Sequence, residues 1–492
     1  MPLPSQLYRT SLALLTDFYE LTMAYAAWKS GEAEREAAFT LSFRSSPFDG
    51  GFTVAAGLEH AIDFVSSLRF QEEDLAFLRA QRGLDGAPLF EPAFLEALAR
   101  LEVDVDLAAV PEGTVVFPQE PLLRISGPVI PCMLLESPLL TVVNFQSLIA
   151  TKAARVCLAA QGEPVVEFGL RRAQGIDGAL TASRAAYLGG CAATSNTLAG
   201  KLWGIPVRGT HAHSWVMLHA EEREAFFAYA RALPANCVFL VDTYGSLDGV
   251  RHAIEAARWL REQGKELVGI RLDSGDLAWL SIEARRMLDE AGFHGAAILA
   301  SNELDETIIQ SLKDQGARIA VWGVGTRLVT GHGEGALGGV YKLVAVRRSR
   351  EAEWEHRIKV SEQPAKTTVP GLLQVRRFED GQGSAAADVI WDELLGLPSP
   401  AVMIDPVDPT RRTEIPAGAP GEDLLVPIFA RGRRVYEAPP LEAIRARAQA
   451  QLRKFLPGVK RFVNPHRFPV GLERRLHELR TRLVLEARRA PG

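Results

Sequence analysis

The sequence predicts an α/β fold built around a barrel, and three observations support this prediction. Between about residues 137 and 346, seven short apolar runs follow one another, each bounded by a polar or glycine-rich loop. Most runs are separated by about 30 residues, the length of a strand–helix–strand unit. Amphipathic segments with helical spacing fill the intervals. Seven parallel strands in succession favour a barrel over an open sheet, although their period alone does not establish that the barrel closes.

The order of these runs defines the predicted strands. In sequence they are PVVEF, IPVRG, CVFLV, ELVGIRL, AAILA, RIAVWGV and VYKLVAV. Three of the helical segments between them end at a glycine, which is a common stop signal for a helix. Those three segments are SLDGVRHAIEAARWLREQGK, LAWLSIEARRMLDEAG and LDETIIQSLKDQG.

Both flanks of the predicted barrel mix helices with strands. The N-terminal flank is expected to contain a helix over residues 12–29, a hairpin-like stretch at FTLSFRSSPFDGGF, a helix from Gly57 onward and a β segment over residues 112–128. The C-terminal flank is rich in turns and predicts a small β-containing domain with a basic helical tail. We therefore expect three domains, over residues 1–136, 137–346 and 347–492.

Composition limits the classes of function. A chain of 492 residues is long enough for an enzyme-sized cleft, and 47% hydrophobic with 23% charged residues is typical of a globular protein. The formal net charge of −5 gives no overall attraction to nucleic acid or to an anionic membrane. The four cysteines form no CxxC pair and are expected to be free thiols. Without a leader-like N-terminus or a run of eighteen apolar residues, we expect a cytoplasmic enzyme.

Polar residues follow the predicted strands, where the loops of a barrel converge. His213 lies in GTHAHSW between the hydroxyls of Thr210 and Ser214, and acidic Asp242 and Asp273 follow the next two strands. A lone histidine at a strand end is usually structural. In this setting, the pattern favours an oriented imidazole that acts as nucleophile or base.

Arginines and glycines at the same predicted edge suggest an anionic ligand. Arg171, Arg172 and Arg271 follow or end strands, where guanidinium groups can hold carboxylate or phosphate, although each could instead form a salt bridge. The segments GVGT and LGGVYK could bring backbone N–H groups close to an oxyanion, but each is a weak signal alone. In RLDSGD, Asp276 is expected to cap the next helix, which leaves Asp273 for ribose hydroxyls or magnesium.

Two further patterns, a histidine pair and two aromatic residues, do not indicate one function by themselves. His211 and His213 form an HxH pair, which in some barrel hydrolases binds zinc, but the other histidines fall in helix or loop contexts. From spacing alone, Tyr19 and Phe168 are core aromatics.

Taken together and in order, these motifs resemble the nicotinate phosphoribosyltransferase family over nearly the whole chain. The segments that carry the resemblance are LLTDFYELTM, FRSSPFDGGFTVAAGLE, EFGLRRAQGIDGALTASRAAYLGG, GTHAHSW, VDTYGSLDGV, IRLDSGDL, GVGT, LGGVYKL and NPHRFPVGL. The resemblance implies a type II phosphoribosyltransferase fold, an irregular α/β barrel with a flanking α+β domain built from both chain ends. The C-terminal domain would pack on the N-terminal one, in a homodimer with active sites at the subunit interface.

The resemblance also assigns roles to residues. Tyr19 from the partner subunit and Phe168 would sandwich a pyridine ring, since offset stacking suits a flat heteroaromatic acid. Arg271 and Thr210 would hold the nicotinate side of the site. The expected substrate-binding residues are Tyr19, Phe168, Arg171, Thr210, Ser214, Arg271, Gly325, Thr326, Gly338 and Gly339. The last four of these would form the phosphate-binding end of the site.

For catalysis, the resemblance makes His213 a phosphohistidine formed from ATP. Asp242 is our candidate to orient its ring, and Asp273 with Mg²⁺ would stabilise the ribose carbon as pyrophosphate leaves. The implied reaction is ATP-coupled transfer of phosphoribosyl from phosphoribosyl pyrophosphate to nicotinate, giving nicotinate mononucleotide in the salvage (Preiss–Handler) branch of NAD biosynthesis. Such an enzyme is classed as an ATP-dependent ligase.

Substrate choice rests on the stretch CAATSNTLAG. A related nicotinamide enzyme has an Asp beside the amide, whereas this chain has Ser195 and Asn196 there, and the missing carboxylate favours the acid. Three alternatives stay open: the same fold acting on nicotinamide or quinolinate, a metal-dependent hydrolase using His211 and His213, and a noncatalytic pyridine-binding protein.

Overall fold

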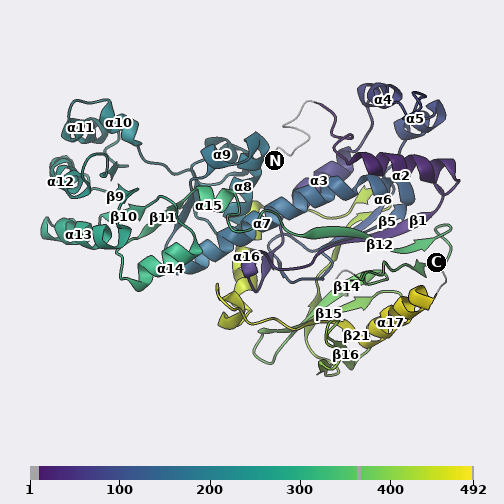
Figure 1. Ribbon diagram of the computed structural model, residues 1–492. Coiled ribbons are helices and arrows are strands. Elements are labelled where there is room, and N and C mark those ends of the chain that lie inside the picture. The colour runs from purple at the N-terminus through teal and green to yellow at the C-terminus, as the bar shows by residue number, and fades with distance from the viewer. Residues whose placement is uncertain (1–9, 363–366, 490–492) are drawn as a thin grey trace. The chain divides into compact units, whose positions relative to one another are not determined.

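The computed structural model describes residues 10–362 and 367–489, and its contacts divide the chain into two compact units (Figure 1). Unit 1 comprises residues 1–148 and 336–492, so it is built from both chain ends, and unit 2 comprises residues 149–335. The fold is α/β, as predicted.

Unit 2 contains a six-stranded parallel sheet that curls into a half-barrel. In spatial order its strands are β7 (Ala193–Thr194), β6 (Val165–Glu167), β11 (Val321–Val324), β10 (Ala297–Ala300), β9 (Gly269–Leu272) and β8 (Val238–Leu240). Its helical segments are η2 (Leu170–Arg172), α8 (Gly175–Gly189), α9 (Thr197–Trp203), α10 (His213–Met217), α11 (Glu222–Ala232), α12 (Ser246–Glu262), α13 (Leu277–Glu290), α14 (Glu306–Asp314) and α15 (Thr326–Val329). Among the described residues, β7 and β8 pair with no further strand, so they are the edges of this sheet.

Five of the seven predicted strands are present in this sheet as β6, β8, β9, β10 and β11, all with parallel neighbours. Two predictions were wrong. The run IPVRG forms only an isolated bridge from Val207 to Thr194, the end of edge strand β7. The run VYKLVAV lies in β12 (Gly339–Arg347) of unit 1, antiparallel to β1 (Glu36–Phe43). An apolar run has the same composition in either setting, so its pattern does not reveal the direction of its neighbours.

Unit 1 contains two larger sheets and a small one. The first is antiparallel, in the order β13 (Glu355–His356), β12, β1, β5 (Leu123–Pro128), β3 (Asp106–Ala109), β19 (Val426–Ala430) and β20 (Arg433–Arg434). The second has the order β17 (Arg412–Ile415), β16 (Ala401–Ile404), β21 (Val470–Glu473), β15 (Ala385–Asp392), β14 (Leu373–Glu379) and β18 (Gly421–Asp423). β2 (Thr53–Val54) pairs with β4 (Val115–Val116), so β1 and β2 do not form the expected hairpin.

Helices accompany these sheets in unit 1. They are α2 (Phe18–Lys29), η1 (Pro47–Asp49), α3 (Leu58–Ser67), α4 (Glu72–Arg79), α5 (Pro92–Ala99), α6 (Val129–Leu134), α16 (Leu441–Arg453), η4 (Pro457–Lys460) and α17 (Arg474–Arg489), and α7 (Glu136–Ala160) begins here. α3 starts directly after Gly57, as predicted. Gly57 has a φ of +96°, and a side chain there would meet the backbone of Val142 in α7, so only glycine fits.

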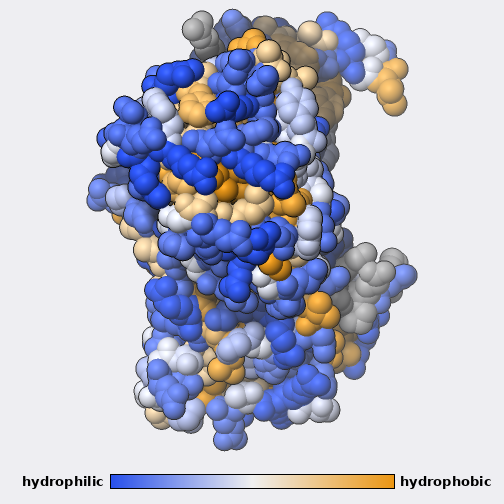
Figure 2. Space-filling view, turned by 90° about the vertical axis from the view of Figure 1, so that its left-hand side faces the viewer, coloured by the Kyte–Doolittle hydropathy of each residue, from blue (hydrophilic) through white to orange (hydrophobic). Residues whose placement is uncertain are grey.

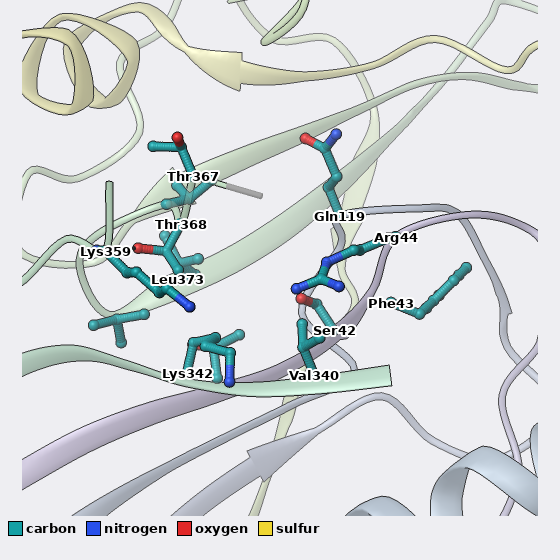
Figure 3. Close-up of a pocket in the computed structure, with 13 residues that line it drawn as sticks. Ser42, Phe43, Arg44, Gln119, Val340, Lys342, Lys359, Thr367, Thr368 and Leu373 are labelled. Atoms are coloured by element: carbon teal, nitrogen blue, oxygen red, sulfur yellow. Dashed lines mark hydrogen bonds between the residues drawn. The ribbon is translucent and has the colours of Figure 1, made fainter. Parts of the chain in front are cut away.

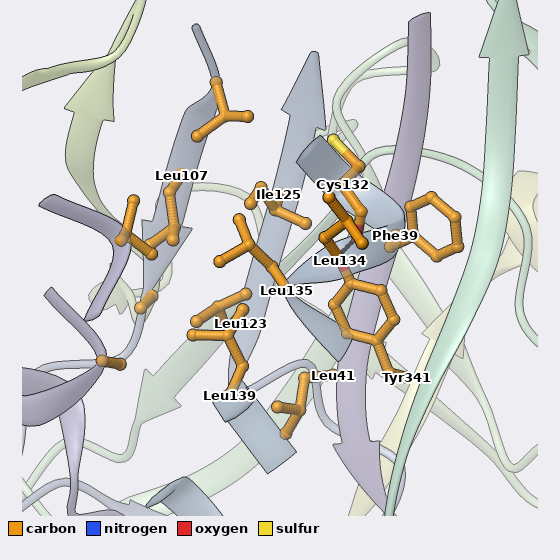
Figure 4. Packing of buried hydrophobic residues seen from close by; sticks show 14 of the residues in the cluster. Phe39, Leu41, Leu107, Leu123, Ile125, Cys132, Leu134, Leu135, Leu139 and Tyr341 are labelled. Carbon is orange, nitrogen blue, oxygen red and sulfur yellow. Dashed lines mark hydrogen bonds between the residues drawn. The ribbon is translucent and has the colours of Figure 1, made fainter. Parts of the chain in front are cut away.

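The main core of unit 1 lies between its first sheet and α6 (Figure 4). Leu41, Leu123 and Ile125 from β1 and β5 are at most 1% exposed. The rings of Phe39 and Tyr341 stack with centroids 4.8 Å apart. Burial of such side chains is the dominant favourable term in folding, at about 25 cal/mol per Å² of apolar surface.

The segment Val129–Ala160, made of α6 and α7, is the one candidate membrane span among the described residues by length and composition. In its most apolar window 56% of the residues are buried within the protein, which is also the pattern of a core helix. On the face shown in Figure 2, hydrophilic residues predominate and hydrophobic ones gather in small patches between them. Within the described residues, Cys132, Cys157, Cys191 and Cys237 form no disulfide.

Candidate active site

Arg271 is the centre of a polar cluster in unit 2. It lies on β9, between β8 and β10, and its guanidinium donates in three directions. Nε donates to the Ser301 hydroxyl at 2.7 Å, and one terminal nitrogen donates to the Thr210 hydroxyl at 3.1 Å. The other terminal nitrogen donates to Asp273 Oδ1 at 3.0 Å. Because these partners come from three different loops, the guanidinium is fixed in place.

Phe168 lies beside this guanidinium. Arg271 Cζ is 5.4 Å from the centre of the Phe168 ring, within range of a cation–π interaction. The Phe168 N–H donates to the carbonyl of Val324 on β11 at 2.8 Å. A Cβ on Gly323 would lie 2.6 Å from the ring, so glycine is required there for the ring to occupy this position. Phe168 therefore follows β6 directly and contacts the polar cluster, and its role in stacking a pyridine ring stays a prediction.

His213 is the first residue of α10, and its side chain is 41% exposed. Its Nδ1 is 3.2 Å from the Thr243 hydroxyl, and its Nε2 is 3.8 Å from Asp273 Oδ2. Asp273 thus connects the imidazole to Arg271. The two ring nitrogens therefore face different groups, a hydroxyl that can donate or accept beside Nδ1 and a carboxylate beside Nε2.

Asp242, expected to orient the His213 ring, has a different set of partners. Its Oδ2 accepts hydrogen bonds from the Asp273 N–H at 2.9 Å and from the Ser274 hydroxyl at 2.6 Å. The contact expected of Asp242 is made by Thr243, one residue further along the chain. Asp242 instead holds the loop that carries Asp273.

His211 is buried in the core, with only 7% exposure. Its Nε2 accepts the Leu240 N–H at 3.2 Å, and its ring packs edge-on against Tyr229. Burial lowers the pKa of His211 to about 4, so the ring is neutral near pH 7. Because its acceptor nitrogen is already occupied, His211 does not share a metal with His213 in the manner of a barrel hydrolase.

Asp273 and Asp242 suit a magnesium ion whose remaining ligands are water and substrate phosphates. Asp273 is partly engaged by Arg271 and Ser301, while Asp242 Oδ1 is buried and has no hydrogen-bond partner among the described residues. No group of three or more metal-binding side chains occurs in the described part of the chain. Mg²⁺ commonly takes one or two protein carboxylates and completes its shell with water and substrate phosphates, which suits this donor set.

The remaining predicted residues of unit 2 surround the same strand ends. Arg171 and Arg172 are exposed in η2, directly after Phe168, and make no ion pair among the described residues. Gly325 lies against the Phe168 carbonyl, with a Cβ position 3.1 Å from that oxygen, and Thr326 begins α15. Ser214 is exposed on α10. As predicted, Asp276 caps α13 by accepting the Trp279 N–H at 3.1 Å.

The stretch expected to distinguish acid from amide has no carboxylate at 195 or 196. Asn196 is 2% exposed, and its side-chain oxygen accepts the Ala199 N–H at 3.2 Å, which caps α9. The side chain of Asn196 is therefore committed to the protein interior rather than offered to a ligand.

The other predicted residues belong to unit 1. Tyr19 is at the start of α2 and 46% exposed. Burial, and next the charge of Glu136, raise the pKa of Tyr19 to about 12, so its hydroxyl stays protonated. Gly338 precedes β12 and Gly339 begins it. A Cβ on Gly339 would lie 2.0 Å from the Asn144 side chain of α7, so a larger residue does not fit there.

A basic pocket in unit 1 was not predicted. It is lined by Arg44 after β1, Lys342 on β12 and Lys359 after β13, with the hydroxyls of Thr367 and Thr368 (Figure 3). Arg44 and Lys359 extend into the pocket from opposite sides. Neither forms an ion pair within the described ranges. Three cations together with hydroxyl side chains around one hollow provide donors that can bind an anion.

Sequence reasoning placed Thr243 and Ser301 at strand ends but gave no role to either, and they contact His213 and Arg271. Both are hydroxyl residues at strand ends, and that placement was the available signal. Arg44 and Lys342 stand in the quoted motifs FRSSPFDGGF and LGGVYKL. Their convergence depends on the pairing of β1 with β12, which the sequence did not reveal.

Comparisons with known proteins agree on one family. Three family models match: the nicotinate phosphoribosyltransferase N-terminal domain over residues 14–144, the family itself over 164–386, and its C-terminal domain over 373–480. The chain is 41% identical to a nicotinate phosphoribosyltransferase of Bacillus subtilis, covering 97% of each chain. It is 38% identical to one of Dictyostelium discoideum, covering 96% of this chain and 88% of that protein.

A solved structure gives the same result. The crystal structure of human nicotinic acid phosphoribosyltransferase superposes with a TM-score of 0.83 and 34% sequence identity, covering 95% of this chain and 99% of the human chain.

Proposed function

The chain belongs to the nicotinate phosphoribosyltransferase family, and from this membership we propose that it joins nicotinate to the ribose of phosphoribosyl pyrophosphate in NAD biosynthesis. The observation that carries the proposal is one connected set of side chains in unit 2. Phe168 contacts Arg271, Arg271 binds Asp273, and Asp273 faces His213. An aromatic face, a cation and an imidazole therefore lie together at the strand ends of one sheet.

Nicotinate is a flat ring with a carboxylate, and the cluster offers a partner for each part. A guanidinium has five N–H donors, of which Ser301, Thr210 and Asp273 accept three. The remaining donors on the terminal nitrogens can bind the nicotinate carboxylate. Phe168 supplies one stacking surface for the ring, and Tyr19 of the partner subunit supplies the other in a homodimer.

His213 is the proposed acceptor of the γ-phosphoryl group of ATP. The lone pair of a neutral ring nitrogen forms a bond to the γ-phosphorus as the bond from that phosphorus to its bridging oxygen breaks, and ADP leaves. Asp273 and Thr243 hold the ring in one orientation for this attack. Coupling to ATP would make the overall reaction an ATP-dependent ligation, with phosphohistidine hydrolysis driving product formation.

In the transfer step, the pyridine nitrogen attacks the ribose carbon that bears pyrophosphate. A bond from nitrogen to this carbon forms as the bond from carbon to the pyrophosphate oxygen breaks. Mg²⁺, when bound, neutralises charge on the departing pyrophosphate. Asp273 and Asp242 are the carboxylates that would hold the ion. Asp242 also fixes the loop that places Asp273.

Phosphate oxygens need further cations. Arg171 and Arg172 are exposed beside Phe168 and have no ion pair among described residues. Gly325 and Thr326 offer backbone N–H groups and a hydroxyl on the next strand end. In unit 1, Gly338 and Gly339 and the basic pocket of Arg44, Lys342 and Lys359 are proposed to bind phosphate.

Competition between substrates tests this function. The purified protein, phosphoribosyl pyrophosphate and Mg²⁺ would be incubated with nicotinate, nicotinamide or quinolinate, with and without ATP. We expect nicotinate mononucleotide as the main product and faster turnover with ATP. Preference for the amide or for quinolinate would assign the same fold to another pyridine substrate. Tightly bound zinc together with hydrolase activity would contradict the proposal.

A further inference from the structure

Glu167 is a buried carboxylate directly beside the proposed ring-binding residue. It is the last residue of β6 and immediately precedes Phe168, and it has no solvent exposure. The proposed chemistry assigns it no part. Charged side chains are seldom buried to this extent without a specific task, because desolvation of a carboxylate is costly.

The Glu167 side chain accepts hydrogen bonds from both sides. Oε2 accepts the Thr194 hydroxyl at 2.6 Å and the Ser183 hydroxyl at 2.8 Å. Oε1 accepts the N–H of Gly169, the residue after Phe168. The side chain therefore binds the chain immediately after Phe168 and, at the same time, anchors it to α8 and to the end of β7.

The network continues to the 194–196 turn. The Asn196 N–H donates to the Thr194 hydroxyl at 2.9 Å, and the Asn196 side-chain amide donates to Ser183 at 3.1 Å. The Ser195 N–H donates to the carbonyl of Glu167 itself at 2.9 Å. Glu167 is thus the common acceptor that joins this turn to the segment carrying Phe168.

No cation among the described residues forms an ion pair with Glu167. Burial raises the pKa of this carboxyl, and the hydrogen bonds from Thr194, Gly169 and Ser183 act in the opposite direction. An apolar residue would fill the same volume without this desolvation cost, but it would leave the Gly169 N–H without its acceptor. A carboxylate at this position therefore differs from an apolar residue in accepting the hydrogen bonds of Thr194, Ser183 and Gly169.

We propose that Glu167 is a positioning residue that fixes the Phe168 ring against Arg271 and thereby sets the affinity for the pyridine acid. This inference rests on the proposed function. Glu167 does not touch substrate. It acts by accepting the Gly169 N–H. Phe168 is therefore held on its N-terminal side by the strand pairing of β6 and on its C-terminal side by the hydrogen bond of Gly169. The exposed Arg171 in η2 follows two residues later and depends on the same anchor.

Two variants at this position test the proposal. Glu167→Ala removes the acceptor, whereas Glu167→Gln keeps an oxygen for Gly169 and presents an amide that the two hydroxyls can accommodate. We expect Glu167→Ala to raise the KM for nicotinate about tenfold, the equivalent of about 1.4 kcal/mol, with the KM for phosphoribosyl pyrophosphate nearly unchanged. Glu167→Gln should restore most of the nicotinate affinity.

Glu306 offers a matched control in the same unit. It is 3% exposed and pairs with Lys152 at 2.8 Å and Arg155 at 2.8 Å. Within the described ranges it forms no hydrogen bond or ion pair with Phe168 or Arg271. Glu306→Gln should lower the stability of the fold and leave the nicotinate KM unchanged. If Glu167→Ala gives poor yields, Thr194→Val and Ser183→Ala remove one donor each, and each should raise the nicotinate KM by about threefold.

A readout independent of turnover separates this inference from the proposed function. Amide hydrogen exchange over residues 168–172 and 195–199 should be faster in Glu167→Ala than in wild type, and not in Glu306→Gln. Unchanged exchange or an unchanged nicotinate KM in Glu167→Ala would overturn the inference, as would an equal KM increase in Glu306→Gln. A wild type without any activity on nicotinate would instead overturn the proposed function, and the ring-binding role with it.

Discussion

The guanidinium carbon of Arg271 lies 5.4 Å from the centre of the Phe168 ring, while the same group binds Asp273 at 3.0 Å. One side chain therefore connects the ring-binding surface to the carboxylate that faces His213. Because the guanidinium is planar and held at three of its donors, the stacking surface and the reactive residues keep a fixed relation. In the proposed mechanism, this fixed relation allows ring binding and phosphoryl transfer to His213 to share one set of strand ends.

Replacing Arg271 tests the carboxylate-binding role. Arg271→Lys keeps a positive charge but loses the planar fork and the donors to Ser301 and Thr210. We expect the KM for nicotinate to rise about thirtyfold, because a charge-assisted hydrogen bond contributes about 2 kcal/mol. Steady-state kinetics with nicotinate as the varied substrate measures this. Arg286→Lys, at an exposed position of α13, is the matched control, and an equal effect there would argue against the assignment.

Replacing Tyr19 tests the second stacking surface. Tyr19→Ala should raise the KM for nicotinate far more than the KM for phosphoribosyl pyrophosphate, because only the pyridine ring would stack on it. Tyr19→Phe keeps the ring and should behave like wild type. The neighbouring Phe18 is similarly exposed, 47% against 46% for Tyr19, so Phe18→Ala controls for loss of apolar surface on α2. Equal changes in both KM values would contradict stacking.

The stability of the fold should depend on pH through His211. Its pKa in the folded chain is about 4, below the ordinary value of 6.5, because the ring is buried. Between these values the unfolded chain binds a proton that the folded chain does not, so stability is full above about pH 6.5 and is lost as the pH falls toward 4. From this residue we expect a loss of about 2 kcal/mol between pH 7 and pH 5.

Chemical denaturation at the two pH values measures that loss. His211→Gln should show a smaller decrease between pH 7 and pH 5 than wild type. His294→Gln removes an exposed histidine of the same unit and should leave the decrease unchanged. An identical pH dependence in wild type and His211→Gln would show that His211 does not carry it.

Much of the unit 2 sheet could be predicted because parallel strands are buried on both faces and read as short apolar runs. β6, β8, β9, β10 and β11 were recognised in this way. β12 was misplaced, because its run looks the same beside an antiparallel partner. The sequence contained no cue to the pairing of β1 with β12, which joins segments roughly 300 residues apart.

The site was predicted as a set of strand-end residues, but its contacts were not. Asp242 and Thr243 are adjacent in sequence, and the path of the backbone after β8 decides which one reaches the His213 ring. Spacing in the sequence does not fix that path. Glu167 was passed over for a similar reason, because a carboxylate at the end of a strand reads as solvent-exposed until its three donors are known.

Labelling with γ-³²P ATP tests the central claim most directly, that the His213 ring accepts a phosphoryl group at the strand ends of unit 2. The account predicts acid-labile label on the wild-type protein and on the exposed-histidine control His294→Ala, and none on His213→Ala. Equal labelling of His213→Ala and wild type, or no label on wild type, would contradict it.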